Sequence, residues 1–244
     1  MKRVRLIRHA ESAANAGLAT TAPDSIPLTE KGQLQARTLA DSITSAPDLI
    51  ISSPFERAIA TALPTAARFP HVSFEFWPVE EFTYLSPNRF AGTTQADRKP
   101  HAESYWENGD AAMIDGPGAE SFDHLIGRVG AMLAKLADHD AQDILVFSHG
   151  QFIRAAAWQI KHGGHVRSYD LMPEFRALDV REPFRNCSSY QLVFNDTRWT
   201  VECQIDSSGQ EILHPYHEHR SKAASLSNHP KLARAILLSV LRRP

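Results

Sequence analysis

Cysteine is scarce in this 244-residue sequence, which has only Cys187 and Cys203, in no spacing that suits a metal ion. Two cysteines cannot build a disulfide framework for a chain of this length, so we expect free thiols and a reducing compartment. Long apolar runs are also missing, since none approaches the roughly 20 residues of a membrane-spanning helix. The basic start at Met1–Arg3 is followed too soon by charged residues to be a signal peptide. These absences together predict a cytoplasmic protein without a membrane partner.

An excess of either charge is missing as well. The formal net charge is −2, with 26 Lys and Arg against 28 Asp and Glu. This balance gives no general attraction to nucleic acid or to an anionic membrane, so we expect neither as a partner. Attraction of an anionic small molecule must therefore come from cations gathered locally. The composition, 43% hydrophobic and 22% charged, is typical of a globular protein, and the length suits a single domain over residues 1–244.

Three short apolar runs end abruptly at polar or cationic residues. They cover residues 4–9, 49–54 and 145–150, and each is followed, at once or after a loop, by a pattern typical of a helix. Buried strands separated by helices predict an α/β fold, a three-layer α/β/α sandwich around a mostly parallel sheet. Because the carboxyl ends of parallel strands form the ligand crevice of such a sheet, the polar residues at or just after these ends should meet at one rim. These residues are Arg8, His9, Arg57 and His149.

Two of the predicted helices carry start signals in the sequence. Thr29 is predicted to cap a helix whose apolar stripe includes Leu34. Ser53 and Glu56 have the spacing of a capping box, with Pro54 at the first helical position. The first signal places a helix after the loop that follows residues 4–9, and the second places a helix directly after residues 49–54.

The remaining segments are less regular. Residues 83–120, rich in Pro, Gly, Asn and charge, are predicted as an insertion that roofs the site, with one helix near 102–113 and a strand-like stretch at 79–84 before it. No regular element is predicted over 163–187, where four scattered arginines are candidates to bind a second anionic group of a substrate, although such residues are more often solvated. A hairpin is predicted over 188–205.

Residues from about 206 to 244 are predicted as a C-terminal extension. This segment is polar until a short helix over 232–241, whose apolar surface is a candidate for docking on the domain or for joining two subunits as a homodimer. His217 and His219 lie close together in it, but they lack the spacing and the cysteine partner typical of a metal site. We therefore expect a solvated tail there.

The predicted rim suits a phosphoryl group. Arg8 and Arg57 keep their charge at working pH and offer paired donors that match phosphate oxygens. His9 stands beside these cations, which disfavour its protonation and leave an imidazole nitrogen free to attack phosphorus. Attack gives a phosphohistidine, and the arginines with His149 would stabilise the charge of the transition state. This predicted chemistry needs neither a metal nor another cofactor.

One further role is that of proton donor to the leaving alkoxide, which suits a carboxylic acid with a raised pKa. Glu80 and Glu81 end the strand-like stretch before the predicted insertion. Adjacent side chains on an extended segment face opposite ways, so only one of the two can reach the pocket. Spacing alone does not choose between them.

These residues resemble the motifs of the histidine phosphatase superfamily, also called the phosphoglycerate mutase-like superfamily. Leu6–Asn15 resembles its Arg-His-Gly signature, with Ala10 in place of the usual Gly. Ser52–Ala58 is similar to the block that carries the second pocket arginine, and Ser148–Gly150 to the block that carries the second pocket histidine. Gly118–Phe122 resembles a run that opens a family helix between them. The blocks stand in family order, which makes the resemblance specific.

The resemblance implies a role for each site residue. His9 is the implied phosphorylated nucleophile, and Glu81, followed by the apolar Phe82 as in the family's acid block, is preferred to Glu80 as the acid. The implied phosphate-binding residues are Arg8, Arg57 and His149, with Asn15 near the entrance. The implied protein is a metal-independent phosphomonoesterase of the histidine acid phosphatase type, acting on a phosphorylated small molecule.

Two other functions stay open on the sequence. A cofactor-dependent phosphoglycerate mutase would return the phosphoryl group to an organic acceptor, but such mutases follow their acid with an Arg-His-Tyr-Gly-like run where this sequence has Phe82–Leu85. A non-catalytic relative would bind a phosphorylated ligand without turning it over, and would typically lack the nucleophile or an arginine. A phosphatase of unidentified substrate is the preferred hypothesis.

Overall fold

The computed structural model of the chain describes residues 1–163 and 168–212. It divides the chain into a first unit that ends at Glu211 and a second that begins at Ile212. The predicted C-terminal helix, the pair His217 and His219, and one of the four scattered arginines, Arg167, lie outside the described residues. The prediction of a single domain over the whole chain stays a prediction.

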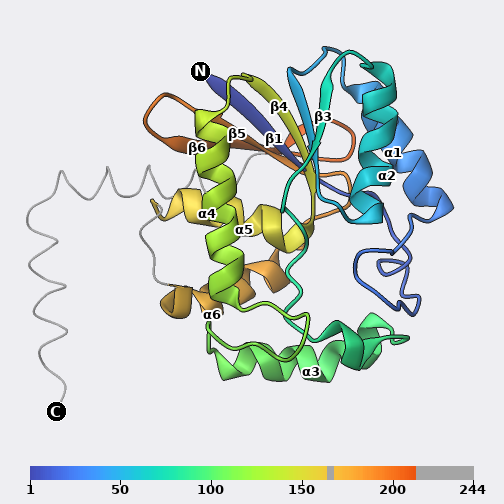
Figure 1. Cartoon of the computed structure of the whole chain (residues 1–244), viewed down its shortest axis with the longest axis vertical. Coiled ribbons are helices and arrows are strands. Elements are labelled where there is room, and N and C mark those ends of the chain that lie inside the picture. The colour runs from blue at the N-terminus through green and yellow to red at the C-terminus, as the bar shows by residue number, and fades with distance from the viewer. Residues whose placement is uncertain (164–167, 213–244) are drawn as a thin grey trace, which may run out of the picture. The chain divides into compact units, whose positions relative to one another are not determined.

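Within the described residues, one seven-stranded sheet has the order β3-β2-β4-β1-β5-β6-β7 (Figure 1). The strands are β1 (Lys2–Arg8), β2 (Leu49–Ser52), β3 (Ser73–Phe76), β4 (Asp143–Ser148), β5 (Ser189–Phe194), β6 (Trp199–Ile205) and β7 (Glu211–Ile212). Strands β3, β2, β4 and β1 pair in parallel, whereas β5 is antiparallel to β1 and to β6. The predicted mostly parallel sheet and the predicted hairpin are both confirmed.

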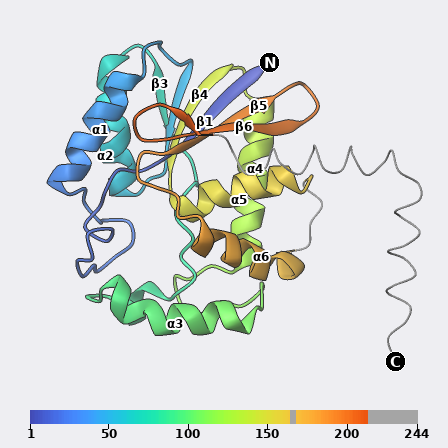
Figure 2. The ribbon, with the colours of Figure 1, turned by 180° about the vertical axis from the view of Figure 1, so that it is seen from behind.

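Helices cover both faces of this sheet, which confirms the three-layer architecture (Figures 1 and 2). They are α1 (Glu30–Ser42), α2 (Glu56–Arg68), α3 (Gln95–Asn108), α4 (Phe122–Asp138), α5 (Gly150–Lys161) and α6 (Ser168–Arg181), with a 3-10 helix η1 (Pro87–Phe90). α1 and α2 pack together on one face, and α4 and α5 pack together on the other. Among the described helices, none has the length and apolarity that spanning a bilayer requires.

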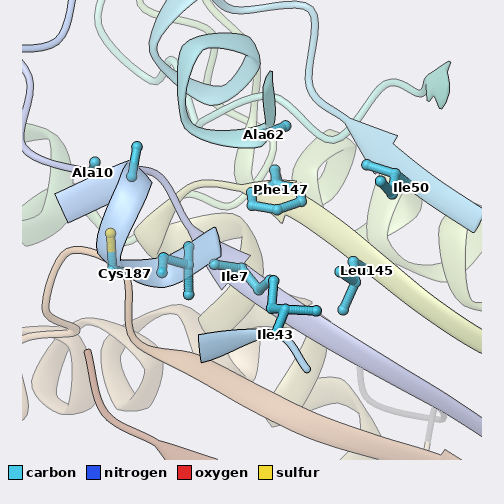
Figure 3. Close-up of a cluster of buried hydrophobic side chains, with 10 residues drawn as sticks. Ile7, Ala10, Ile43, Ile50, Ala62, Leu145, Phe147 and Cys187 are labelled. Atoms are coloured by element: carbon cyan, nitrogen blue, oxygen red, sulfur yellow. The ribbon is translucent and has the colours of Figure 1, made fainter. Parts of the chain in front are cut away.

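A buried apolar cluster joins the sheet to α1 and α2 (Figure 3). Strand residues Ile7, Ile50 and Phe147 meet Leu39 from α1 and Ala62 from α2, and all five are 1% exposed or less. Burying aliphatic and aromatic side chains of this size stabilises the fold by about 1.5–3 kcal/mol each. Ile7 and Phe147 each precede the last residue of their strand, so the cluster packs next to the predicted rim.

Start signals were predicted correctly for one helix and wrongly for the other. The Thr29 side chain caps α1 by accepting a hydrogen bond from the Gly32 amide at 3.0 Å, as expected. The capping box at Ser53 is wrong, because α2 begins at Glu56 after Phe55, and the Ser53 hydroxyl accepts from the Phe55 amide instead. Leu34 is 59% exposed, so the predicted apolar stripe of α1 does not include it.

Three other segments differ from the sequence-based expectation. Residues 79–84 form no strand, and the helix predicted near 102–113 lies earlier, as α3. Its start is set by a capping box in which the side chains of Thr94 and Asp97 each accept from the other's backbone amide. Residues 163–187 include α6, although no regular element was expected there.

Candidate active site

The ends of three parallel strands come together at one place, as predicted. Because β4 lies between β1 and β2, Arg8 stands opposite Ser148, and Ser52 stands opposite Phe147. The next backbone atoms continue the pairing, since the His9 amide donates to the Ser148 carbonyl at 2.9 Å. The residues that follow the strands therefore share one end of the sheet.

His9 is 2% exposed, and hydrogen bonds to both ring nitrogens define its tautomer. Nδ1 lies 2.7 Å from the Ala10 carbonyl oxygen, an acceptor, so Nδ1 carries the hydrogen. Nε2 accepts a hydrogen bond from Arg57 Nε at 3.2 Å. Burial holds the pKa of His9 well below its ordinary value, and the charges of Arg57 and Arg8 lower it further. The imidazole is therefore neutral, with its lone pair on Nε2.

Two guanidinium groups flank this imidazole. Arg57 is the second residue of α2 and donates from Nη1 to the Pro23 carbonyl at 2.5 Å. Arg8 ends β1 and donates to the Phe184 carbonyl, while its buried Nε has no hydrogen-bond partner within the described residues. Burial lowers the pKa of Arg57 to about 10, so it stays cationic at neutral pH. The site thus holds two positive charges, the buried Arg57 and the half-buried Arg8, next to a neutral nucleophile.

His149 occupies the N-cap position of α5, although its side chain makes no capping hydrogen bond. It is fully buried, and its ring lies 5.1 Å from the ring of His9, centroid to centroid. Its Nε2 is 2.9 Å from the Ser53 hydroxyl, and burial holds its pKa well below the ordinary value. His149 therefore contacts the nucleophile, although it is not among the residues that line the open pocket.

The structure distinguishes the two adjacent glutamates by their partners. Glu80 lies 3.3 Å from Arg128 Nη1, whereas Glu81 lines the pocket that contains His9. The Glu81 carboxyl accepts hydrogen bonds from the backbone amides of Phe82 and Gln151, both at 3.1 Å. Burial raises the pKa of Glu81, against the opposing effect of Arg57 and Arg8. Geometry therefore favours Glu81 as the proton donor.

Two supporting residues were missed by the sequence analysis. Asn186 donates to the His9 carbonyl at 2.9 Å and to the side-chain oxygen of Asn15 at 3.0 Å, which places Asn15 in the pocket wall. Thr61 accepts from the Ala10 amide at 3.0 Å and donates to the Arg57 carbonyl at 2.6 Å. Thr61 is a polar residue one turn after Arg57 on the buried face of α2, which was a usable signal. Asn186 lies in a loop far along the chain and offered none.

These residues open into a pocket of about 700 Å³. Its wall combines the strand ends with the loop of residues 13–27, the segment 83–120 and α6. The loop and the segment are joined by hydrogen bonds from the Thr20 amide to the Thr93 carbonyl and from the Gly92 amide to the Thr20 carbonyl. In Figures 1 and 2, α3 lies beyond the end of the sheet at which β1 finishes. The phosphate-binding candidates thus occupy one end of a much larger space.

Metal ligands are not grouped in this part of the molecule. Among residues 1–163 and 168–212, no three His, Cys, Asp or Glu side chains form a set that could hold a metal ion. What the site does contain is a neutral imidazole, two guanidiniums and a carboxyl with a raised pKa. These are the parts needed to bind a dianion, attack it and protonate a leaving group.

Comparison with known proteins shows the family of this chain and solved structures with a similar fold. The model of the histidine phosphatase superfamily (branch 1) matches residues 4–207. Similar solved structures include alpha-ribazole phosphatase from Shigella flexneri, with a TM-score of 0.63, 23% identity, and coverage of 82% of this chain and 94% of that chain. Mycobacterial glucosyl-3-phosphoglycerate phosphatase in complex with VO3 has a TM-score of 0.64 and 23% identity, with coverage of 83% of this chain and 98% of that chain. A phosphoserine phosphatase mutant from Entamoeba histolytica in complex with phosphoserine has a TM-score of 0.65 and 20% identity, with coverage of 86% of this chain and 99% of that chain. At these identities the likeness shows a shared fold, and the comparison with curated proteins finds no match.

Proposed function

Because the chain belongs to the histidine phosphatase superfamily, we propose that it hydrolyses phosphomonoesters through a covalent phosphohistidine on His9, without a metal ion. The observation that carries this proposal is the state of His9, a buried neutral imidazole whose Nε2 lone pair lies 3.2 Å from Arg57 Nε. A nucleophile in this state attacks without first losing a proton. The adjacent guanidiniums bind the group that it attacks.

In the first step, His9 Nε2 forms a bond to phosphorus while the bond from phosphorus to the ester oxygen breaks. Glu81 gives its proton to that oxygen, so the alcohol leaves neutral and Glu81 becomes a carboxylate. Arg57 Nε exchanges the His9 nitrogen for a phosphoryl oxygen, and the partnerless Nε of Arg8 takes another. Both cations thereby stabilise the negative charge of the equatorial oxygens.

In the second step, water attacks phosphorus and the nitrogen–phosphorus bond breaks. The Glu81 carboxylate takes a proton from this water, which restores the carboxylic acid, and inorganic phosphate leaves. The backbone amides of Phe82 and Gln151 hold the carboxyl in place through both steps. His149, in contact with the His9 ring, keeps that ring oriented.

Hydrolysis is preferred to transfer onto an organic acceptor. The residues after Glu81 that line the pocket are Phe82, Thr83, Tyr84 and Leu85, and none of them is cationic. The three similar structures are phosphatases by name, and the substrates in their names differ widely in their organic parts. The organic part of this substrate must therefore be inferred from the residues that line the pocket.

The test is phosphate release from a panel of phosphomonoesters in the presence of EDTA, with wild type, His9→Ala and His71→Ala. His71 is an exposed histidine away from the site and serves as the matched control. We expect turnover in EDTA by wild type and His71→Ala, and none by His9→Ala. An acid-labile phosphoryl label should form on wild type and on His71→Ala, and it should not form on His9→Ala. Turnover that survives in His9→Ala, or that EDTA abolishes, would overturn the proposal.

A further inference from the structure

The pocket is much larger than a phosphoryl group. At about 700 Å³, it has the size of pockets that enclose a whole drug-sized ligand. The catalytic residues His9, Arg57 and Glu81 occupy one part of its wall. The rest of the wall must therefore contact the organic part of the substrate, and its chemistry indicates what that part carries.

Two further guanidiniums line the pocket away from the strand ends, Arg98 on α3 and Arg176 on α6. The Arg176 guanidinium lies over the Trp106 ring, 5.2 Å from its centroid, and 3.4 Å from Asp179. Its side chain is 30% exposed. Arg176 is thus held by an aromatic face while part of it stays open to the pocket.

Asp179 does not cancel the charge of Arg176, because it is engaged by a second arginine. Arg154 is 1% exposed, and its Nε lies 3.1 Å from one oxygen of Asp179. The other oxygen accepts from the side chain of Gln151 at 3.0 Å. A buried arginine needs a carboxylate more than a half-exposed one does. Asp179 and Arg154 therefore make a neutral pair, and Arg176 adds one net positive charge to the wall.

Arg98 is fixed to the backbone rather than to an acid. Its Nη1 donates to the Thr93 carbonyl at 2.8 Å and to the Thr93 hydroxyl at 3.0 Å. Within the described part of the chain, no carboxylate forms an ion pair with Arg98. These bonds hold the guanidinium in place, and the neighbouring Asp97 acts on it through its charge without forming an ion pair.

Tyr84 connects this wall with the catalytic end. It lines the pocket, and it is near enough to Arg98 to affect the pKa of that guanidinium. Burial raises the pKa of Tyr84. The positive charge of Arg176 lowers this pKa, and the negative charge of Glu81 raises it. Glu81, Tyr84 and the two distal arginines line one and the same pocket, so one extended ligand can contact the proton donor and the distal cations together.

We propose that Arg98 and Arg176 bind a second anionic group of the substrate, so that the preferred phosphomonoester carries another negative charge, such as a carboxylate or phosphonate, on its organic part. This inference rests on the hydrolysis proposed above. The chain as a whole has a net charge of −2, so the attraction is local to the pocket. Charge-assisted hydrogen bonds of this kind contribute about 1.5–3 kcal/mol each, which corresponds to about tenfold or more in kcat/KM.

The test uses three alkyl phosphomonoesters with the same spacer, ending in methyl, carboxylate or phosphonate. We expect wild type to prefer an anionic ester over the methyl ester by about tenfold or more in kcat/KM. Arg98→Gln and Arg176→Gln should each reduce this ratio, and the double variant should bring it close to one. Arg68→Gln, which removes an exposed arginine paired with Asp41 outside the pocket, should keep the wild-type ratio. The carboxylate and phosphonate esters show which anion is preferred.

Binding of the same esters to His9→Ala, measured by calorimetry, separates this inference from the proposed function. Tighter binding of an anionic ester, lost in the double arginine variant, supports the second anion site even if no ester is hydrolysed. Equal binding of all three esters by His9→Ala overturns it, even if wild type hydrolyses every one. A preference that persists in the double variant also overturns it, because the anion would then bind elsewhere.

Discussion

At the scale of single residues, the shifted pKa values of His9 and Glu81 set the pH range in which the site works. The pKa of His9 is lowered by burial and by two cations, and the pKa of Glu81 is raised by burial. His9 must be neutral to attack, so the rate falls only when the pH drops through its depressed pKa. Glu81 must be protonated to donate, so the rate falls when the pH rises through its elevated pKa. Because one pKa is lowered and the other is raised, the two conditions overlap in the pH interval between the pKa of His9 and the pKa of Glu81.

Replacement of Glu81 should affect substrates according to their leaving groups. Glu81→Gln cannot donate a carboxylic proton, so hydrolysis of an alkyl phosphomonoester should fall by about 10²–10⁴-fold. A nitrophenyl ester needs no proton donor, so the variant should still release a burst of nitrophenolate equal to one phosphorylated site. In Glu81→Gln, the fall in rate at alkaline pH that titration of Glu81 causes in wild type should be absent. Stopped-flow kinetics measures both, and equal losses for the two esters would contradict the role of Glu81 as acid.

Thr61 offers a test of how the nucleophile is supported. Its hydroxyl is fully buried and joins the Ala10 amide to the Arg57 carbonyl. Thr61→Val removes both bonds and leaves the amide unsatisfied, so the free energy of unfolding should fall by about 1–3 kcal/mol. Thr61→Ser keeps the hydroxyl and should lose much less in urea denaturation. A loss in Thr61→Ser as large as that in Thr61→Val would mean that the methyl group contributes as much as the hydrogen bonds, and no loss in Thr61→Val would contradict their role.

At the scale of elements, the contact between the loop of residues 13–27 and the segment 83–120 closes one side of the pocket. The Thr20 amide donates to the Thr93 carbonyl at 3.0 Å. Thr20→Pro removes that donor, while Thr20→Ala keeps it. We expect the proline variant to raise KM by up to about tenfold, the value of one such bond, with the melting temperature unchanged. A similar rise in the alanine variant would assign the effect to the threonine side chain.

Sequence reasoning succeeded for elements whose signals are local and failed where tertiary contacts decide. The parallel strands and the Thr29 cap follow from short apolar runs and one hydroxyl. α6 was missed because its charged residues and Pro173 hid the spacing of Met172, Phe175 and Leu178, all of them buried. Spacing alone left Glu80 and Glu81 open and the resemblance preferred Glu81; the ion pair of Glu80 with Arg128, which no spacing along the chain reveals, adds a physical reason for that preference.

At the scale of the whole molecule, the like charges of Arg8 and Arg57 beside His9 repel one another at a cost in free energy. Binding of inorganic phosphate should relieve this cost and stabilise the protein by about 2.7 kcal/mol at a concentration one hundred times Kd. Thermal denaturation with added phosphate measures the shift. Arg57→Gln should lose most of it, and Arg68→Gln, at the other end of the same helix, should keep it. An equal shift in both variants would place the phosphate outside the proposed site.

The order of strands also governs when this enzyme can be assembled during synthesis. Val4 in β1 pairs with Ile144 on one side and with Leu192 on the other. β1 therefore waits for partners that are synthesised more than one hundred residues after it. Pairings this distant along the chain form slowly, because a large loop must close before any contact is gained. The surroundings of His9, which directly follows β1, can therefore form only after β4 and β5 have been synthesised.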